Sequence, residues 1–301
     1  MDGVLNVLKP AGMTSHDVVD VLRRLAGQRR VGHTGTLDPG AAGVLVLVLG
    51  RATKIAEFLT ASDKAYRVEV AFGVSTDSGD AFGTVVRTSD ASAVTEGRLG
   101  DLLPQFTGRL QQTPPMTSAV KVGGVRLYRR ARRGETVEVT AREVTIHSLT
   151  LLRFWDGPSP RALLDMECSK GTYVRAIARD LGEALGTGAH ASFMLRRRVG
   201  RFELAESRTL EELARLAAEG SLPGALLEMD GALSDLPVVD LAPGQRRSVL
   251  EGIPLPLFRV PDWQALPSGA SIRLRDRGAL IALGRIEAGV LRPFKVLSGP
   301  S

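Results

Sequence analysis

One carboxylate, Asp38, lies within a run of small residues that extends from Gly32 to Leu45. A residue that precedes proline is biased toward an extended or turn backbone. The pair Pro39-Gly40 is suited to the centre of a tight turn. We therefore expect the Asp38 carboxylate on a loop with little bulk around it, where a substrate can approach. The plain alternative is a glycine-rich turn whose aspartate caps its own backbone.

Arg175 is the second side chain that could take part in chemistry. Apolar residues at helical spacing predict a helix over residues 174–185, which ends at Gly186. Arg175 then falls in the first turn, where the helix dipole disfavours a cation by about 0.3 kcal/mol or more. This placement indicates an anion nearby, although a surface arginine at a helix end is the alternative.

Four segments are predicted to be the strands that position these residues. Residues 66–72 and 164–168 alternate between apolar and polar side chains, which is typical of half-buried strands. Residues 4–8 and the apolar run 44–49 are also predicted to be strands, the second of them buried.

Two further helices have recognisable start signals. Ser15 is predicted to cap a helix that ends at Gly27, and Thr209 with Glu212 forms a capping box for a helix that ends at Gly220. Because strands and helices do not alternate strictly, the pattern favours an α+β fold with mixed or antiparallel pairing.

Composition restricts the class of protein. The chain has 301 residues and a net charge of +6, which suggests a polyanionic partner. Cys168 is the only cysteine and the four histidines are far apart, so no metal site and no cofactor are expected. The N-terminus does not read as a signal peptide, and no apolar run is long enough to span a membrane, so we expect a cytoplasmic protein.

The run from Gly32 to Leu45, GHTGTLDPGAAGVL, resembles the catalytic motif of the TruB family of pseudouridine synthases, the bacterial tRNA uridine-55 enzymes. Further segments occur in the order of that family, and the matches extend over roughly residues 3–201. These segments are Leu8–Ser15, Lys64–Val68, Ser169–Arg175 and Gly188–His190 with Leu195–Arg197.

The resemblance implies a pseudouridine synthase fold with a large mixed sheet and a central cleft. It places the catalytic domain at residues 1–230, with an RNA-gripping thumb loop at about 111–135. Residues 236–301 are broken by proline and glycine, hold nine basic and five acidic residues, and are expected to form a small β-rich, PUA-like RNA-binding domain.

The resemblance also implies roles for individual residues. Asp38 would be the nucleophile and Arg175 its partner, with Tyr66 stacking on the target base and a candidate for proton transfer. Leu195 would line the pocket, and His33 would fill the space left by the flipped uridine. Whether Asp38 attacks C1′, attacks C6 or supports a glycal path stays open, and so does the base for the C5 proton.

Other residues are expected to contact the RNA or support the site. Asp80 could orient Arg175 or its own loop, and Lys9 belongs to the first matching motif. Basic clusters are predicted to contact phosphates, although such runs are usually only solvated surface. The cluster members carried forward are Lys121, Arg126, Arg129, Arg130, Arg132, Arg133, Arg196, Arg197 and Arg198.

The expected function is therefore that of a tRNA pseudouridine synthase acting on uridine 55 of the TΨC loop. The partner would be the T arm of tRNA, with no further protein required and the enzyme a monomer. One alternative is a sibling synthase, including the guide-RNA-dependent branch. The other is a non-catalytic RNA-binding or tRNA-folding protein. A nucleotide-binding enzyme is disfavoured because residues 35–42 lack the ending of a phosphate-binding loop.

Overall fold

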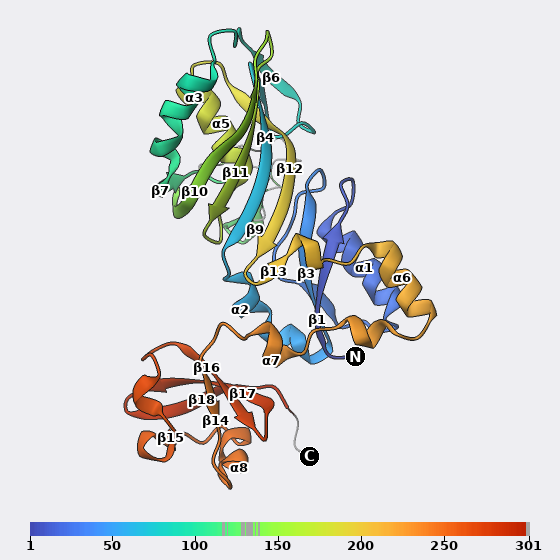
Figure 1. The fold of residues 1–301 in the computed structure, drawn as a ribbon, viewed down its shortest axis with the longest axis vertical. Coiled ribbons are helices and arrows are strands. Elements are labelled where there is room, and N and C mark those ends of the chain that lie inside the picture. The colour runs from blue at the N-terminus through green and yellow to red at the C-terminus, as the bar shows by residue number, and fades with distance from the viewer. Residues whose placement is uncertain are drawn as a thin grey trace.

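The computed structural model describes residues 1–115, 118, 120–127, 130, 135, 137 and 139–298. Two sheets dominate its described residues, one of nine strands and one of five (Figure 1). Helices pack on the larger sheet, so the predicted α+β class is confirmed. No helix within the described ranges is long and apolar enough to cross a membrane.

The nine-stranded sheet is mixed, with the order β1-β3-β12-β4-β11-β10-β7, β2 on β3 and β13 on β12. Its strands are β1 Gly3–Lys9, β2 Val31–His33, β3 Ala42–Leu49, β4 Lys64–Phe72, β7 Gly108–Gln112, β10 Arg142–Trp155, β11 Arg161–Cys168, β12 Ala189–Val199 and β13 Phe202–Glu203. All four strands predicted from alternation or apolar runs are confirmed.

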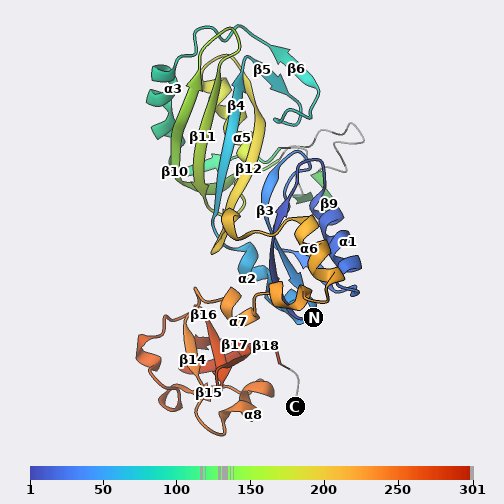
Figure 2. The same cartoon turned by 45° about the vertical axis from the view of Figure 1, so that its right-hand side comes forward.

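Helices and short 3₁₀ turns connect the strands of both sheets (Figure 2). The helices are α1 Ser15–Leu25, α2 Ala56–Thr60, α3 Glu96–Leu102, α5 Val174–Ala184, α6 Leu210–Ala218, α7 Met229–Ala232 and α8 Gln245–Leu250. The 3₁₀ turns are η1 Gly50–Ile55, η2 Leu103–Phe106, η3 Leu204–Glu206, η4 Leu222–Ala225, η5 Leu257–Arg259 and η6 Trp263–Ala265.

The predicted start of the first helix is wrong by one residue. The N-cap is Thr14, whose hydroxyl accepts from the Asp17 N–H at 3.1 Å while the Asp17 carboxylate accepts from the Thr14 N–H at 2.8 Å. Ser15 is already helical and its hydroxyl bonds elsewhere. The capping box predicted at Thr209 and Glu212 is confirmed.

Helices cover the two halves of the large sheet separately. Helices α3 and α5 pack their apolar side chains on β4, β10 and β11, in one buried cluster that includes Tyr66 and Cys168. Helices α1 and α6 pack on β1 and β3 in a second cluster that includes Leu22, Leu47 and Leu213. In Figure 1 these two groups of helices flank different parts of one continuous sheet.

The two halves of the sheet join where β3 meets β12. The two strands run parallel there and pair through Leu195 with Ala42 and Arg196 with Gly43. Gly43 has a φ of +115°, and a Cβ at this position would lie 2.2 Å from the Arg196 carbonyl oxygen. Glycine is needed at this contact because any side chain would push the two strands apart. The loop that carries Asp38 comes directly before this junction.

The second sheet forms a β-rich unit after residue 236, as predicted. Its order is β14-β16-β17-β18-β15, with bounds Val238–Asp240, Leu255–Pro256, Ser271–Asp276, Ala279–Glu287 and Val290–Val296 for β14 to β18 in chain order. It contacts α2 through the Phe58 and Phe294 rings, whose centroids are 6.2 Å apart. The domain boundary and the PUA-like assignment remain predictions.

Two small hairpins complete the described structure. Strands β5 Val74–Thr76 and β6 Val85–Thr88 pair with each other, as do β8 Lys121–Val122 and β9 Val125–Arg126. The second hairpin lies in the predicted thumb loop at about 111–135. Several thumb residues, among them Tyr128, lie outside the described residues.

Candidate active site

The Asp38 loop is a tight turn held from several sides. The Ala41 N–H donates to the Asp38 carbonyl at 3.1 Å, which closes the turn predicted around Pro39-Gly40. The Gly12 N–H donates to the Pro39 carbonyl at 2.8 Å. The Ser15 hydroxyl accepts from the Leu37 N–H at 2.8 Å and donates to the Leu37 carbonyl at 3.1 Å. The start of α1 therefore supports the residue immediately before Asp38.

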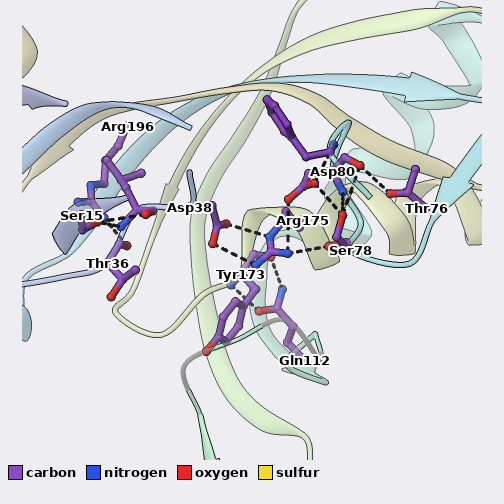
Figure 3. A network of polar contacts seen from close by, with 12 residues as sticks. Ser15, Thr36, Asp38, Thr76, Ser78, Asp80, Gln112, Tyr173, Arg175 and Arg196 are labelled. Atoms are coloured by element: carbon purple, nitrogen blue, oxygen red, sulfur yellow. Dashed lines mark hydrogen bonds and ion pairs between the residues drawn. The ribbon is translucent and has the colours of Figure 1, made fainter. Parts of the chain in front are cut away.

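Arg175 contacts both oxygens of the Asp38 carboxylate (Figure 3). Its Nε lies 2.9 Å from Oδ2, and its Nη2 donates to Oδ1 at 3.1 Å. The Arg175 side chain is 4% exposed, whereas the Asp38 side chain is 32% exposed. The predicted pairing of an anion with this first-turn arginine is thus present as a forked contact, and one side of the carboxylate remains open to solvent.

A second carboxylate lies behind the guanidinium. Asp80 Oδ2 is 3.5 Å from Arg175 Nη1, and the same Nη1 donates to the Ser78 carbonyl at 2.7 Å. Asp80 Oδ1 in turn accepts from the Ser78 hydroxyl at 2.7 Å. The loop after β5 therefore holds Arg175 in the orientation that presents its fork to Asp38.

The first turn of α5 has a further support that sequence reasoning missed. Gln112, at the end of β7, accepts from the Tyr173 N–H at 2.7 Å and donates to the Tyr173 carbonyl at 3.0 Å. Tyr173 is the N-cap residue and makes no side-chain cap of its own. The Gln112 amide instead binds both backbone groups of Tyr173, which fixes the chain two residues before Arg175. A glutamine at the end of a strand carries no local sequence signal for this role.

Two opposing influences act on the protonation of Asp38. Burial raises the pKa of the Asp38 carboxyl above its usual range, and the Arg175 guanidinium opposes that shift. Asp80, a like charge, adds to the rise. The forked contact with Arg175 and the solvent on the open side of the carboxylate both favour the ionised form of Asp38.

Arg196 has a different role from the predicted one. Its side chain is 1% exposed, and it donates to the carbonyls of Val44 at 2.8 Å, Gly35 at 3.0 Å and Thr36 at 3.2 Å. A guanidinium surrounded in this way has no face for a phosphate. The prediction of RNA contact at Arg196 is therefore corrected: this side chain ties β12 to the Asp38 loop.

Lys9 is likewise buried rather than available to RNA. Its ammonium donates to the carbonyls of Met13 at 2.6 Å, Pro10 at 2.8 Å and Pro39 at 3.3 Å. Burial lowers the pKa of Lys9 to about 8. The predicted substrate contact is corrected to a link between the Leu8–Ser15 segment and the turn that follows Asp38.

The other cations of the Leu195–Arg198 segment are partly exposed and paired with carboxylates. Arg197 forms an ion pair with Asp165, and Arg198 lies 3.0 Å from Glu167. Leu195 is half-buried and pairs with Ala42 beside the Asp38 loop. Their contacts with RNA or with a flipped base remain predictions.

Tyr66 and His33 lie on strands next to the loop. Tyr66 is 7% exposed and belongs to the same buried cluster as Leu37 and Ala41, which flank Asp38. Burial raises the pKa of Tyr66, and the adjacent Arg196 charge opposes the shift. His33 is half-buried, and its Nδ1 accepts from the Gly35 N–H at 3.3 Å. Stacking by Tyr66 and the flipping role of His33 remain predictions.

The predicted thumb contacts are mostly outside what the structure describes. Arg129, Arg132 and Arg133 lie outside the described residues, and for Lys121 and Arg126 the backbone alone is described, as part of β8 and β9. Arg130 lies 3.7 Å from Glu135 in an ion pair. Within the described ranges, no three His, Cys, Asp or Glu side chains gather as a metal site would require.

Comparison with known proteins identifies the family of this chain. Residues 23–174 match the TruB family pseudouridylate synthase N-terminal domain, and residues 175–234 match the tRNA pseudouridylate synthase B C-terminal domain. An H/ACA RNP bound to a substrate RNA containing 2′-deoxyuridine has a chain with the same fold. Its TM-score is 0.75 at 22% identity, over 99% of this chain and 85% of that one.

Curated relatives extend the match to almost the whole chain. The tRNA pseudouridine synthase B of Pelotomaculum thermopropionicum is 48% identical, over 96% of this chain and 92% of that protein. The protein of that name from Symbiobacterium thermophilum is 53% identical, over 84% and 83%. The chain belongs to the TruB family of pseudouridylate synthases, as the sequence motifs predicted.

Proposed function

We propose that this protein is the tRNA pseudouridine synthase that converts uridine 55 in the TΨC loop to pseudouridine. The observation that carries the proposal is the forked contact between Asp38 and Arg175, at 2.9 and 3.1 Å, on a loop that leaves the carboxylate open on one side. Membership of the TruB family supports the choice of tRNA as substrate.

The proposed reaction needs a nucleophile and oriented charge. The N1–C1′ bond of uridine breaks, the base turns, and C5 joins C1′; C5 loses a proton and N1 gains one. Atoms and electrons balance without a redox carrier, so the proposal includes no cofactor. Asp38 serves as nucleophile or charge stabiliser, whether at C1′, at C6 or along a glycal path.

The remaining residues have supporting roles in this proposal. Arg175 keeps Asp38 ionised and oriented, because a guanidinium binds both carboxylate oxygens at once. Tyr66 contacts the base and is the candidate for proton transfer. His33 occupies the position of the flipped uridine, whose removal from the stack costs a few kcal/mol.

Docking of the T arm is assigned to the arginines of the thumb loop and to the two partly exposed arginines of β12. The thumb residues Arg129, Arg130, Arg132 and Arg133, together with Arg197 and Arg198, would contact phosphates. We also propose that the protein acts as a monomer in the cytoplasm without a further protein partner. Sedimentation of the enzyme alone and with tRNA measures its oligomeric state and so tests the proposed monomer.

The decisive experiment uses an unmodified tRNA transcript and maps pseudouridine by position. We expect one modified uridine, at position 55, and none when that uridine is replaced by cytidine. Asp38→Asn serves as the inactive control. Modification that requires an added guide RNA would favour the guide-dependent branch, and tight binding without any pseudouridine would favour a non-catalytic tRNA-folding protein.

A further inference from the structure

The loop that supports Arg175 also carries an exposed aromatic ring. Phe82 is 74% exposed, and its N–H donates to Asp80 Oδ1 at 3.0 Å. The other oxygen of the same carboxylate lies 3.5 Å from Arg175 Nη1. One carboxylate thus connects the backbone of Phe82 to the guanidinium that holds Asp38.

The Phe82 ring lies on the turn that presents Asp38. A Cβ built on Gly40 would be 2.0 Å from the ring carbon Cε2 and 2.4 Å from Cδ2. Glycine at position 40 is what allows the ring to approach the backbone so closely. Gly40 follows Asp38 by two residues, so an exposed phenyl group lies against the turn that presents the carboxylate.

Backbone hydrogen bonds fix the loop that carries this ring. The Ala81 N–H donates to the Ala191 carbonyl of β12 at 3.1 Å, and the Gly83 N–H donates to the Asp80 carbonyl at 3.3 Å. An aromatic side chain has two rotatable angles, and here the backbone before and after it is held. The ring is therefore presented to a ligand at a small cost in conformational entropy.

Burial does not account for Phe82, because three quarters of the residue is in solvent. Isolated exposed apolar side chains are common and need no explanation by themselves. Val85 and Val86, 56% and 63% exposed on the same hairpin, are of this kind. Phe82 differs from them through its contact with the Asp38 turn and through the carboxylate that it shares with Arg175.

We propose that Phe82 is a base-stacking residue, which receives the flat face of an RNA base adjacent to the uridine that enters the site. The proposal rests on the proposed function. Base flipping unstacks the RNA around the target uridine, and an aromatic ring can stack on the exposed face of an adjacent base whatever its identity. Phe82 would thereby position the T loop over Asp38.

The test compares three variants on an unmodified T-arm stem–loop. Phe82→Ala removes the ring, Phe82→Leu keeps an apolar side chain, and Phe82→Tyr keeps an aromatic one. Affinity, single-turnover rate and the fluorescence of 2-aminopurine placed in turn at each loop purine are measured. Val86→Ala is the matched control, and thermal unfolding of each variant checks the fold.

Stacking is expected to make Phe82→Ala and Phe82→Leu bind about 5- to 150-fold more weakly, while Phe82→Tyr stays within about 2-fold of wild type. One loop position should show 2-aminopurine quenching that needs an aromatic residue at 82. Wild-type affinity and quenching in Phe82→Leu would overturn the proposal. Unchanged affinity and quenching in Phe82→Ala would also overturn it. If wild-type protein forms no pseudouridine at all, the proposed function fails instead.

Discussion

Ser15 and Leu37 exchange two hydrogen bonds across a buried contact. The Ser15 hydroxyl accepts from the Leu37 N–H at 2.8 Å and donates to the Leu37 carbonyl at 3.1 Å. Because Ser15 is the first residue of α1 and Leu37 directly precedes Asp38, this pair anchors the Asp38 turn to a helix. The start of α1 and the Asp38 loop are thereby held in a fixed position relative to each other.

Removal of the Ser15 hydroxyl should therefore slow the chemistry. In Ser15→Ala both backbone groups of Leu37 lose their partner, which should lower the free energy of unfolding by about 1–3 kcal/mol. The single-turnover rate should fall while affinity for tRNA changes little. Thr14→Ala is the matched control, since it removes the N-cap at a cost of about 1 kcal/mol without touching Leu37. Equal rates in both variants would contradict an anchoring role.

Substitution of Asp38 should separate chemistry from binding. Asp38→Ala and Asp38→Asn should abolish pseudouridine formation and leave tRNA affinity largely intact, because phosphate contacts supply most of the affinity. Single-turnover assays and filter binding measure the two quantities. Asp20→Asn, at a partly exposed ion pair on α1, controls for loss of one negative charge. Turnover near the wild-type rate in Asp38→Ala would show that the catalytic assignment is wrong.

The pH dependence should report the contact between Asp38 and Arg175. An ionised Asp38 is needed, so the rate should fall as pH drops through its folded pKa. Burial raises that pKa and Arg175 opposes the rise. Arg175→Met removes the opposing charge, so the acid limb should move to higher pH. Arg175→Lys keeps the charge but not the fork, and should lower the rate more than the affinity.

The control for this experiment is Arg179→Met, one turn further along α5. Arg179 pairs with Asp180 and not with Asp38. The acid limb of the pH–rate profile of Arg179→Met should coincide with that of wild type. If Arg175→Met lost affinity alone and kept its pH profile, Arg175 would be a phosphate contact.

Salt dependence should distinguish buried from docking arginines. Arg196→Met leaves three carbonyls without their donor, so we expect a decrease of about 3 kcal/mol or more in stability. The slope of log affinity against log salt should stay unchanged. Replacement of Arg129, Arg130, Arg132 and Arg133 by Ala should instead flatten that slope by about 0.7–0.9 for each phosphate that the protein no longer neutralises. If Arg196→Met flattened the slope of log affinity against log salt, the original prediction of RNA contact at Arg196 would be supported instead.

Alkaline pH should act on stability through Cys168. Burial raises the pKa of the Cys168 thiol to about 11 from an ordinary value of 9.0. Ionisation of the thiol in the unfolded chain begins near pH 9, below the folded pKa, so stability should fall as pH rises from 9 to 11 and level off above it. The free energy of unfolding should decrease by at most about 2–3 kcal/mol over this range. Urea unfolding of wild type and Cys168→Val from pH 8 to 11 measures this loss of stability. If the free energy of unfolding depended on pH in the same way in both proteins, the prediction would be contradicted.

Local sequence patterns predicted the strands and helices, but not the contacts that hold the Asp38 loop and Arg175 in place. Alternation predicts β4 and β11, and helical spacing predicts α5 with Arg175 in its first turn. Hydroxyl residues favour the cap position, which makes Ser15 a reasonable cap in sequence, yet its neighbour Thr14 fills that position. Gln112 lies 61 residues from Tyr173, and no local pattern records a contact over that distance.

The sequence by itself determined the α+β class, the Asp38 turn and the need for an anion near Arg175, because these depend on backbone preference, periodicity and the helix dipole. Tertiary structure alone decided which basic residues are buried. Arg196 sits in a run of three arginines that looks uniform in sequence, but the alternating faces of β12 and the close approach at Gly43 turn one of them inward. Burial is set by neighbours distant in the chain, so side chains of one type in one segment acquire different roles.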